Sequence, residues 1–302
     1  MAHGTPAAPG EIEAFYTRIR RGNPPSPEQL ADLQARYERI GGVSPLAERT
    51  QAQVDGLAER LEAAAPGRYR VAYGAKHTAP FVEEAAESLA DAGCRVVVGL
   101  VLTPHHSTAG AGEYLARAAG ALAAHPSQPA FHPIPRWYDA PAFAPLIGGR
   151  VRDALEALDP GTADGAVVVF TAHSVPERVV EAGDRYPDEM AESAAAAAAA
   201  AGLADAGWRV AWQSAGRTAE PWVGPALLDV VCELAHGGAG AVVACPIGFV
   251  SDHLEVLYDL DIEARLVAER AGIGFGRTAS LNDDPAFLSL LAGVVQSAAG
   301  EG

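Results

Sequence analysis

Titratable side chains in this sequence gather directly behind short apolar runs. His173 follows the run AVVVFTA, and Lys76 and His77 follow VAYGA. An imidazole has an ordinary pKa of about 6.5, so a histidine in such a position can act as a general base or a metal ligand near neutral pH. A plainer interpretation is that His173 caps the next helix or forms a local hydrogen bond. The positions of this kind are His3–Thr5, Lys76–His77, Pro104–Ser107, His173–Ser174, Gln213–Ser214 and Gly248–Glu255.

A second candidate is a row of carboxylates in the segment 246–265, PIGFVSDHLEVLYDLDIEAR. Ser251 can cap a helix that begins at the next residue. Glu255, Asp259 and Glu263 are then spaced four residues apart along one face, over about 12 Å at a rise of about 1.5 Å per residue. Carboxylates at this spacing repel each other unless a cation compensates them, so the row fits a path for a divalent cation. The plainer interpretation is the solvated face of a helix in an acidic protein.

Arginines are concentrated near the N-terminus of a chain that is otherwise acidic. Guanidinium groups bind carboxylates through forked hydrogen bonds, so such a cluster can hold a substrate that carries several carboxylates. Ordinary charge on a helix surface would give the same composition. Together with the histidine and the carboxylate row, the cluster indicates a divalent cation and a large substrate bearing carboxylates. It comprises Arg18, Arg20, Arg21, Arg36 and Arg39, with Tyr37 among them.

The elements that must position these residues follow a repeated pattern of apolar strand and helix. Continuous apolar strands that alternate with helices are typical of parallel βαβ units covered on both faces. We therefore predict an α/β protein with two doubly wound, Rossmann-like parallel-sheet domains, residues 1–145 and 146–302, and a connector at Arg136–Arg150. Ligands in such folds bind outside the carboxyl ends of strands, so we expect the active-site cleft between the two domains. The predicted strands are Arg70–Gly74, Cys94–Thr103, Ala166–Ala172, Trp208–Gln213 and Ala239–Pro246, and the predicted helices include Pro80–Ala92, Tyr114–Ala123 and the alanine run Ala194–Ala201.

The start of the chain departs from this pattern. A βα fold should open with a strand, whereas the chain begins MAHGTP, which is typical of the end of a strand and the turn after it. We therefore expect either a very short first strand or a start of translation upstream of Met1.

Composition narrows the classes of function. The chain has 302 residues, of which 49% are hydrophobic and 20% charged, a composition typical of a globular protein with a full core. Its net charge of -16 argues against binding nucleic acid or an anionic membrane, which requires a basic surface. No apolar run reaches about 18 residues, and the N-terminus lacks the pattern of a signal peptide, so we expect a soluble, cytoplasmic protein without a membrane span. Cys94, Cys232 and Cys245 are too few and too far apart for an ordinary iron–sulfur cluster.

Two segments, AHSVPERVVEAGDRYPDEM at 172–190 and PIGFVSDHLEVLYDLDIEAR at 246–265, resemble the signature segments of ferrochelatases. Further matches follow in order along nearly the whole chain: AHGTPAAPGEIEAFYTRIRRG, RYERIGGVSPLAERT, YGAKHTAPFVEEA, LTPHHST and WQSAGRTAEPWVGP. The chain is most similar to the soluble, monomeric ferrochelatases of Gram-positive bacteria, which insert ferrous iron into coproporphyrin III to form Fe-coproporphyrin III in haem biosynthesis. The resemblance implies the fold of a class II chelatase, a monomer, and coproporphyrin III and ferrous iron as the bound molecules.

The resemblance also implies roles for single residues. His173 and Glu255 correspond to the inner pair that takes iron and handles the pyrrole protons. His77, Asp259 and Glu263 correspond to an outer metal site, where a second divalent metal such as Mg²⁺ is expected. The positions that contact the porphyrin are His3, Arg20, Arg21, Arg36, Tyr37, Ser44 and Tyr114.

The chain differs from its Gram-positive relatives at His3. The relatives usually have a tyrosine there that can coordinate the iron of the product. Because imidazole also ligates iron, we expect the axial role to remain, with a changed affinity for the product. Some actinobacterial members bind an iron–sulfur cluster through C-terminal cysteines, whereas this chain ends SLLAGVVQSAAGEG, so we expect no cluster.

Several alternative functions stay open. They are a protoporphyrin IX ferrochelatase, another tetrapyrrole chelatase that uses cobalt or nickel, and a non-catalytic haem or porphyrin carrier. The other chelatases are usually shorter or lack the SDHLEVLYD segment, and intact His173 and Glu255 argue against a carrier. A nucleotide-dependent α/β enzyme fits less well, since neither GxxxxGK[ST] nor GxGxxG follows a strand.

Overall fold

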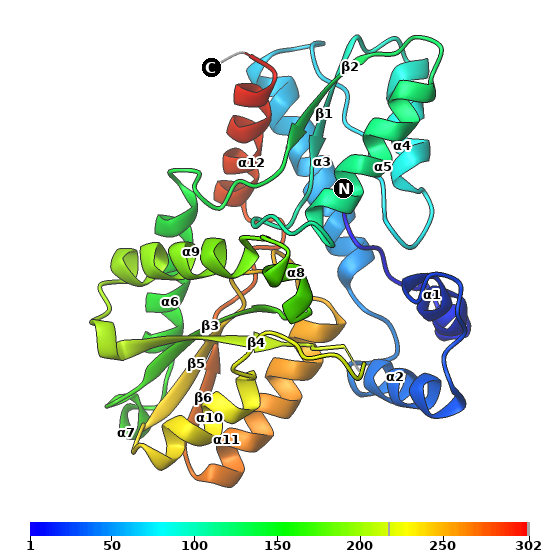
Figure 1. Cartoon of the computed structure of the whole chain (residues 1–302). Helices are drawn as coiled ribbons and strands as arrows, with labels where there is room; N and C mark the ends of the chain where they lie inside the picture. The colour runs from blue at the N-terminus through cyan, green and yellow to red at the C-terminus, as the bar shows by residue number, and fades with distance from the viewer. Residues whose placement is uncertain (217, 301–302) are drawn as a thin grey trace.

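The computed structural model describes residues 1–216 and 218–300. It is an α/β structure with one parallel sheet in each half of the chain, which confirms the predicted fold class (Figure 1). The N-terminal half contains η1 (Pro9–Glu11), α1 (Ile12–Ile19), α2 (Pro27–Arg39), α3 (Leu46–Ala64), α4 (Val82–Asp91), β1 (Val96–Leu100), α5 (Ala111–Ala124) and β2 (Ala130–Ile134). The C-terminal half contains α6 (Phe143–Glu156), α7 (Pro160–Ala163), β3 (Val167–His173), α8 (Glu177–Glu181), α9 (Tyr186–Ala201), η2 (Asp205–Gly207), β4 (Trp208–Gln213), α10 (Leu227–His236), β5 (Ala241–Cys245), η3 (Val256–Ala264), α11 (Arg265–Ala271), β6 (Gly274–Arg277) and α12 (Pro285–Ala298).

The N-terminal sheet contains a first strand reduced to almost nothing. Strands β1 and β2 pair in parallel over their full lengths. Met1 lies beside β1, where its amino group donates to the Leu100 carbonyl oxygen at 2.7 Å and its own carbonyl accepts from the N–H of Leu102 at 3.1 Å. Ala2 then forms a single parallel bridge with Ala75. The very short first strand expected from the sequence is therefore one residue bridge long.

The predicted strand at Arg70–Gly74 does not form. The segment has no strand assignment, and its pairing is limited to the bridge at Ala75. A ladder needs a partner of equal length, and the neighbouring N-terminal segment reaches only from Met1 to His3 before the chain turns away.

The C-terminal sheet has four parallel strands in the order β4-β3-β5-β6. From β3 the chain moves to β4 on one side and then crosses to β5 and β6 on the other. The loops that follow β3 and β5 therefore diverge at a topological switch point, where parallel α/β sheets bind their ligands. His173 is the last residue of β3, so the fold places it at this point.

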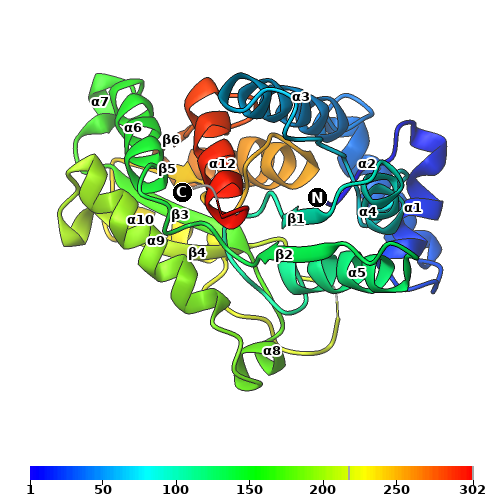
Figure 2. The same ribbon diagram turned by 90° about the horizontal axis from the view of Figure 1, so that it is seen from above.

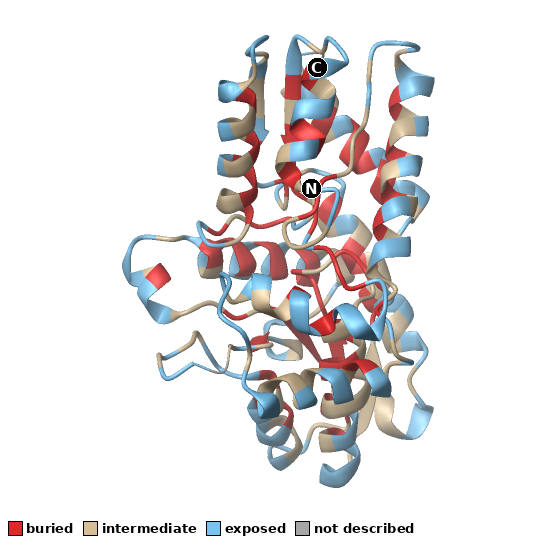
Figure 3. Cartoon of the chain, turned by 90° about the vertical axis from the view of Figure 1, so that its right-hand side faces the viewer, coloured by how far each residue is buried: buried red, intermediate tan, exposed pale blue. Residues whose placement is uncertain are grey.

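Helices cover both faces of this sheet. Val168, Phe170 and Ala172 of β3 pack in the core with α6, α9 and α12, whereas Val169 packs with α10, η3 and α11. This alternation follows from the two-residue period of a strand. Buried residues line the inward sides of the helices, and exposed residues lie on their outer sides (Figure 3).

The alanine run lies in α9, as predicted, and it allows a close helix contact. Ala194, Ala197 and Ala198 are buried. Gly148 of α6 comes so near that a Cβ atom added to it would lie 2.9 Å from Ala200. The small side chains thus let α6 and α9 pack backbone to backbone.

The last helix crosses back to the first half of the chain. Helix α12 lies beside α3 in both views (Figures 1 and 2). Arg60 Nε donates to Ser289 Oγ at 3.1 Å, and His132 Nδ1 donates to the carbonyl oxygen of Ala298 at 2.9 Å. The division predicted between residues 145 and 146 also falls inside α6, because the buried face of that helix continues through the expected connector. The halves of the sequence are therefore not two separate structural bodies.

The carboxylate row lies on a wider helix than expected. The helix begins at Leu254 and continues as the π-helix η3, whose backbone hydrogen bonds join residue i to i+5. Its turn holds more than four residues, so side chains four apart still project from neighbouring positions on one side. Ser251 does not cap this helix; its Oγ accepts a hydrogen bond from Gln53 Nε2 at 2.8 Å.

Membrane insertion finds no support in the helices. Within the described ranges, no helix combines the length and the apolar character needed to cross a bilayer.

Candidate active site

His173 and Glu255 lie together at the carboxyl edge of the C-terminal sheet. His173 ends β3, and Glu255 stands in the first turn of the helix that follows β5. His173 Nε2 is 3.5 Å from Glu255 Oε1. Their side chains are 40% and 34% exposed, so both can be reached from outside. The structure thus brings the predicted inner pair together at the switch point.

A second histidine approaches the same carboxylate. His253 Nε2 lies 3.5 Å from Glu255 Oε2. In both imidazoles Nδ1 donates to a backbone carbonyl oxygen, from His173 to Ser174 at 2.6 Å and from His253 to Ser251 at 2.9 Å. Because a carbonyl oxygen only accepts, Nδ1 carries the proton in each ring and Nε2 faces the carboxylate. Sequence reasoning did not single out His253; its place two residues before Glu255 was the only signal.

The carboxylate controls protonation in this group. Desolvation lowers the pKa of His173, but the charge and hydrogen bond of Glu255 outweigh it and the pKa becomes about 9. Burial alone would raise the pKa of Glu255, yet His173 and His253 hold it well below its ordinary value. At neutral pH the pair is therefore an imidazolium and a carboxylate. The neutral His173 expected from an ordinary histidine pKa is not what this geometry favours.

Asp259 lies one turn further along η3 and is buried. Ser214 Oγ donates to Asp259 Oδ2 at 2.5 Å, and Gln213 Nε2 donates to the same oxygen at 3.5 Å. Oδ1 has no hydrogen-bond partner among the residues described. Burial and the charge of Glu255 raise the pKa of Asp259 to about 6. This carboxyl group can therefore gain and lose a proton near neutral pH.

Arg36 joins α2 to the carboxylate row. Its Nη1 lies 3.6 Å from Asp259 Oδ1, and its Nε lies 3.1 Å from Asp32 Oδ2. The guanidinium group stacks over the ring of Tyr258, 4.8 Å from the centroid. Glu263 extends the row and helps to raise the pKa of both Arg36 and Asp259. The predicted row is present, with Arg36 as its neighbouring cation.

A second group of predicted residues gathers in the N-terminal half. His3 and His77 lie with their ring centroids 4.6 Å apart, and Phe15 packs edge-on against both rings. Burial lowers the pKa of each imidazole, and the neighbouring cations bring the pKa of His77 to about 3. Both rings are therefore neutral at neutral pH. The charge of Glu255 opposes the shift in His3, so His3 lies within electrostatic reach of the inner pair.

The structure does not bring His77 to the carboxylate row. His77 follows the bridge at Ala75 in the N-terminal sheet, whereas Asp259 and Glu263 lie on η3. Across residues 1–216 and 218–300, no three side chains of His, Cys, Asp or Glu are arranged to hold one metal ion. The three-residue outer site implied by the family resemblance is therefore not assembled, because its members belong to different sheets.

Three of the positions expected to contact the porphyrin are buried. The Tyr37 hydroxyl lies 3.3 Å from Thr5 Oγ1. Ser44 Oγ accepts a backbone N–H at the start of α3. The ring of Tyr114 lies 5.3 Å from the ammonium group of Lys76.

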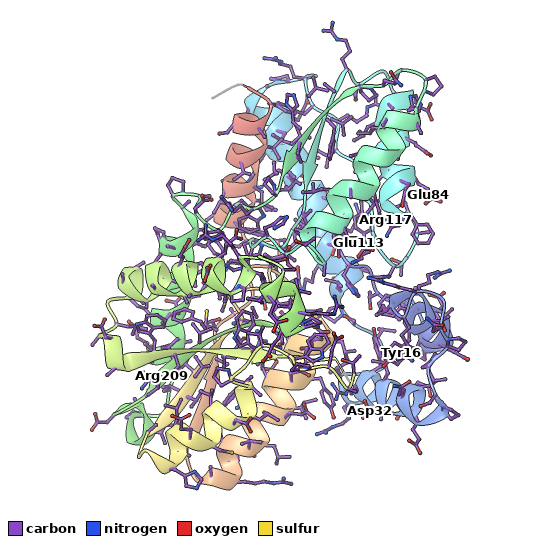
Figure 4. All side chains as sticks on the ribbon, viewed as in Figure 1. Tyr16, Asp32, Glu84, Glu113, Arg117 and Arg209 are labelled. Atoms are coloured by element: carbon purple, nitrogen blue, oxygen red, sulfur yellow. The ribbon has the colours of Figure 1, made fainter. Side chains whose placement is uncertain are left out.

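Arg20 and Arg21 end helix α1 but point to different surroundings. Arg20 stacks over Tyr16, which Figure 4 labels, and its Nε donates to the carbonyl oxygen of Asn23 at 3.2 Å. Arg21 instead lines a cavity that also contains His3.

Comparison with known proteins identifies relatives of the whole chain. The family model named Ferrochelatase matches residues 1–299. The chain is 43% identical over 297 residues to the coproporphyrin III ferrochelatase of Geobacillus kaustophilus, covering 98% of this chain and 93% of the relative. It is 41% identical over 298 residues to the coproporphyrin III ferrochelatase of Geobacillus thermodenitrificans, with coverage of 98% and 93%. It is 40% identical over 295 residues to the ferrochelatase of Herpetosiphon aurantiacus, with coverage of 98% and 96%.

Proposed function

The chain belongs to the ferrochelatase family, and from this premise we propose that it inserts ferrous iron into coproporphyrin III. One observation carries the proposal for this chain: the carboxylate of Glu255 is held between His173 and His253 at the switch point of the C-terminal sheet. The names of the two Geobacillus relatives support coproporphyrin III as the porphyrin.

The reaction exchanges two pyrrole protons of the porphyrin for one ferrous ion. His173 Nε2 and Glu255 Oε1, 3.5 Å apart, offer a nitrogen and an oxygen ligand to a cation on the same side. Imidazole ligates a metal only without its Nε2 proton, so arrival of the iron releases that proton. His253 holds the second oxygen of Glu255 and thereby fixes the direction of the carboxylate.

The protons need an acceptor that works near neutral pH. Glu255 has a strongly lowered pKa and His173 already carries a proton, so neither is a good final acceptor. Asp259, with a pKa of about 6, is better matched to this task. Its hydrogen bond from Ser214 and its contact with Arg36 hold it toward the cleft side of α2.

The porphyrin is proposed to lie between the inner pair and His3. A flat ring hides the lone pairs of its nitrogens, so binding in a distorted shape assists insertion, and contacts to distant carboxylates supply the energy. His3 has a neutral ring and can ligate the product iron from the opposite face. The residues proposed to hold the rim are Arg20, Arg21, Arg36, Tyr37, Ser44 and Tyr114.

We derive no step through an outer Mg²⁺. Asp259 and Glu263 offer the oxygen ligands that Mg²⁺ prefers, but His77 lies with His3 in the other sheet, so the set does not fit one ion.

Anaerobic turnover with ferrous iron tests the proposal. Coproporphyrin III and protoporphyrin IX are supplied in parallel, and metallation is followed by absorbance. We expect insertion into coproporphyrin III with little into protoporphyrin IX. Faster turnover of protoporphyrin IX would overturn the substrate, insertion of cobalt or nickel alone would indicate another chelatase, and binding without turnover would indicate a carrier.

The proposal also includes a monomer that acts in the cytoplasm without an iron–sulfur cluster, as the family resemblance implies. Sedimentation of the purified protein measures its mass in solution. Iron and sulfide analysis of protein purified under argon, with Cys94, Cys232 and Cys245 all unpaired, measures cluster content. A dimer, or stoichiometric sulfide, would contradict the corresponding part.

A further inference from the structure

A cavity of 520 Å³ opens beside His3 in the N-terminal half. This volume falls within the range of about 300–1,000 Å³ that is common for ligand pockets. Helix α5, which supplies one wall, carries Glu113 and Arg117 above α1 in the view of Figure 4. The charged residues of the wall are Arg18 and Arg21 at the end of α1, Lys76 ahead of α4, and Glu113 and Arg117 on α5.

Two of the four cations in this wall are already paired. Lys76 Nζ lies 2.7 Å from Glu113 Oε2. Arg117 grips both oxygens of Glu83 through Nε and Nη2, at 2.6 and 2.7 Å. These pairs leave little net charge, so the positive charge of the cavity comes from α1.

Arg18 and Arg21 keep free guanidinium groups at the rim. Neither forms an ion pair with any residue that the structure describes. The Arg18 guanidinium packs over the ring of Phe81, 5.7 Å from its centroid, which holds it against the wall. Arg21 has a φ of 55°, a left-handed conformation that glycine or asparagine usually takes after a helix. In a chain of net charge -16, two unpaired arginines beside one cavity indicate an anionic ligand.

The two imidazoles in the wall fit the same ligand. His3 and His77 are neutral, so they add no competing charge and can take part in hydrogen bonds. Lys76, Arg117 and Arg18 are among the causes that lower the pKa of His77, after burial and His3, so their positive field reaches the interior of the cavity.

We infer that Arg18, together with Arg21, binds a propionate that coproporphyrin III carries and protoporphyrin IX lacks, so that this cavity selects the porphyrin with four carboxylates over the one with two. Paired guanidinium groups recognise carboxylates through forked hydrogen bonds. The inference rests on the proposed function, since it requires the ring to lie against His3, from which the cavity opens. Arg18 is the residue that it adds to the substrate site.

Equilibrium binding of metal-free porphyrins tests this selection. The full chain and its Arg18→Gln, Arg21→Gln and double variants are titrated with coproporphyrin III and with protoporphyrin IX, and bound porphyrin is measured by fluorescence. We expect each single substitution to raise the Kd for coproporphyrin III by about tenfold, as loss of a charged hydrogen bond does, with a larger rise in the double variant. The Kd for protoporphyrin IX should change by less than about twofold.

Arg209→Gln is the matched control. Arg209 lies on β4, far from α5 in Figure 4, and its guanidinium bonds only to the carbonyl oxygen of Trp208 among the residues described. It removes the same charge outside the cavity and should leave both affinities unchanged. Because Arg18 and Arg21 are exposed, their variants should keep the wild-type melting temperature.

Three results would overturn the inference. Unchanged affinity for coproporphyrin III would show that the arginines do not contact it. An equal loss for both porphyrins would show general attraction without selection, and a loss in Arg209→Gln of the same size would show an effect of net charge. Failure of the wild type to bind or metallate coproporphyrin III would instead overturn the proposed function, and that measurement comes first.

Discussion

Glu255 meets one imidazole on each of its oxygens, and the two histidines differ in how far they reach the solvent. The His173 side chain is 40% exposed, whereas that of His253 is 15% exposed and its ring packs 4.8 Å from the ring of Phe249. A group that touches the porphyrin must be accessible from the cleft. We therefore assign contact with iron and substrate to His173 and a positioning role to His253.

Substitution of His173 tests this assignment. In His173→Ala, iron insertion should fall by at least about 100-fold, because the nitrogen ligand and proton-transfer group are lost. The affinity for metal-free coproporphyrin III should stay within about threefold of the wild type, since the propionate contacts are intact. Stopped-flow absorbance gives the first quantity and fluorescence titration the second.

The control for this substitution is His236→Ala, which removes an exposed histidine at the end of α10 and should keep full turnover. Full turnover in His173→Ala itself would show that Glu255 and His253 suffice without it.

His105 makes folding sensitive to pH at the level of one side chain. It is 2% exposed, Ser193 Oγ lies 2.6 Å from its Nε2, and its Nδ1 has no partner in the described part of the chain. Burial lowers its pKa to about 3. The unfolded chain therefore takes up a proton below about pH 6.5 that the folded chain refuses, so stability is lost as pH falls.

The expected slope from this site is about 1.4 kcal/mol per pH unit between about pH 6 and pH 4. His105→Phe keeps an aromatic ring stacked near Tyr138, 5.3 Å away, but cannot titrate. Urea unfolding at pH 7, 6 and 5 should give curves of stability against pH that are flatter for the variant. Parallel curves for the two proteins would contradict a neutral, buried His105.

At the scale of elements, apolar runs were sufficient to predict some strands and not others. Strands β1, β3, β4 and β5 lie within predicted runs because each is flanked by partners and buried on both faces. Strands β2 and β6 escaped detection because AFHPI contains Pro133 and GFGR contains two glycines. Both are short edge strands, where such residues are tolerated.

The candidate site shows the same limit. Position after a strand was enough to find His173, and spacing was enough to find Asp259 and Glu263. Neither could predict that His77 packs against His3 instead of the carboxylate row, because that depends on how the two sheets face each other. The change from an α-helix to the π-helix η3 also has no signal in residue spacing.

The loop after β1 is fastened to α9 by a buried carboxylate. Glu189 is 1% exposed; its Oε2 accepts the N–H of His106 at 2.7 Å, and its Oε1 accepts from Arg136 Nη1 at 2.8 Å. These bonds join the N-terminal half to the C-terminal half beside the cleft. Glu189→Gln weakens both charged hydrogen bonds, so we expect a loss of about 2 kcal/mol in the free energy of unfolding.

Urea unfolding of Glu189→Gln measures this loss. Glu181→Gln, an exposed position at the end of α8, is the control and should change stability by less than about 0.5 kcal/mol. Equal stability of the two variants would mean that the contacts of Glu189 contribute nothing across the halves.

At the scale of the whole molecule, the two sheets face a shared cleft and are tied behind it by α12. Composition and rhythm were enough to predict two parallel sheets, but the return of the last helix to α3 was not predictable, because its apolar residues fit either core. Phe287 of α12 is fully buried and packs against Trp137, with ring centroids 5.8 Å apart. The same core contains Leu61 of α3 and Ile147 of α6, so one helix stabilises elements from both halves.

This arrangement predicts that the halves unfold together. Phe287→Ala should lower the free energy of unfolding by about 3–5 kcal/mol through loss of burial and the cavity left behind. If α12 couples the halves, hydrogen exchange measured by mass spectrometry should accelerate by the same factor in peptides from β1 and from β4, and urea should give one transition. Leu266→Ala, at an exposed position on α11, should leave exchange in both strands unchanged. Faster exchange in β1 alone would show that α12 stabilises only the N-terminal sheet, and two separate urea transitions would show that the cleft lies between bodies that fold independently.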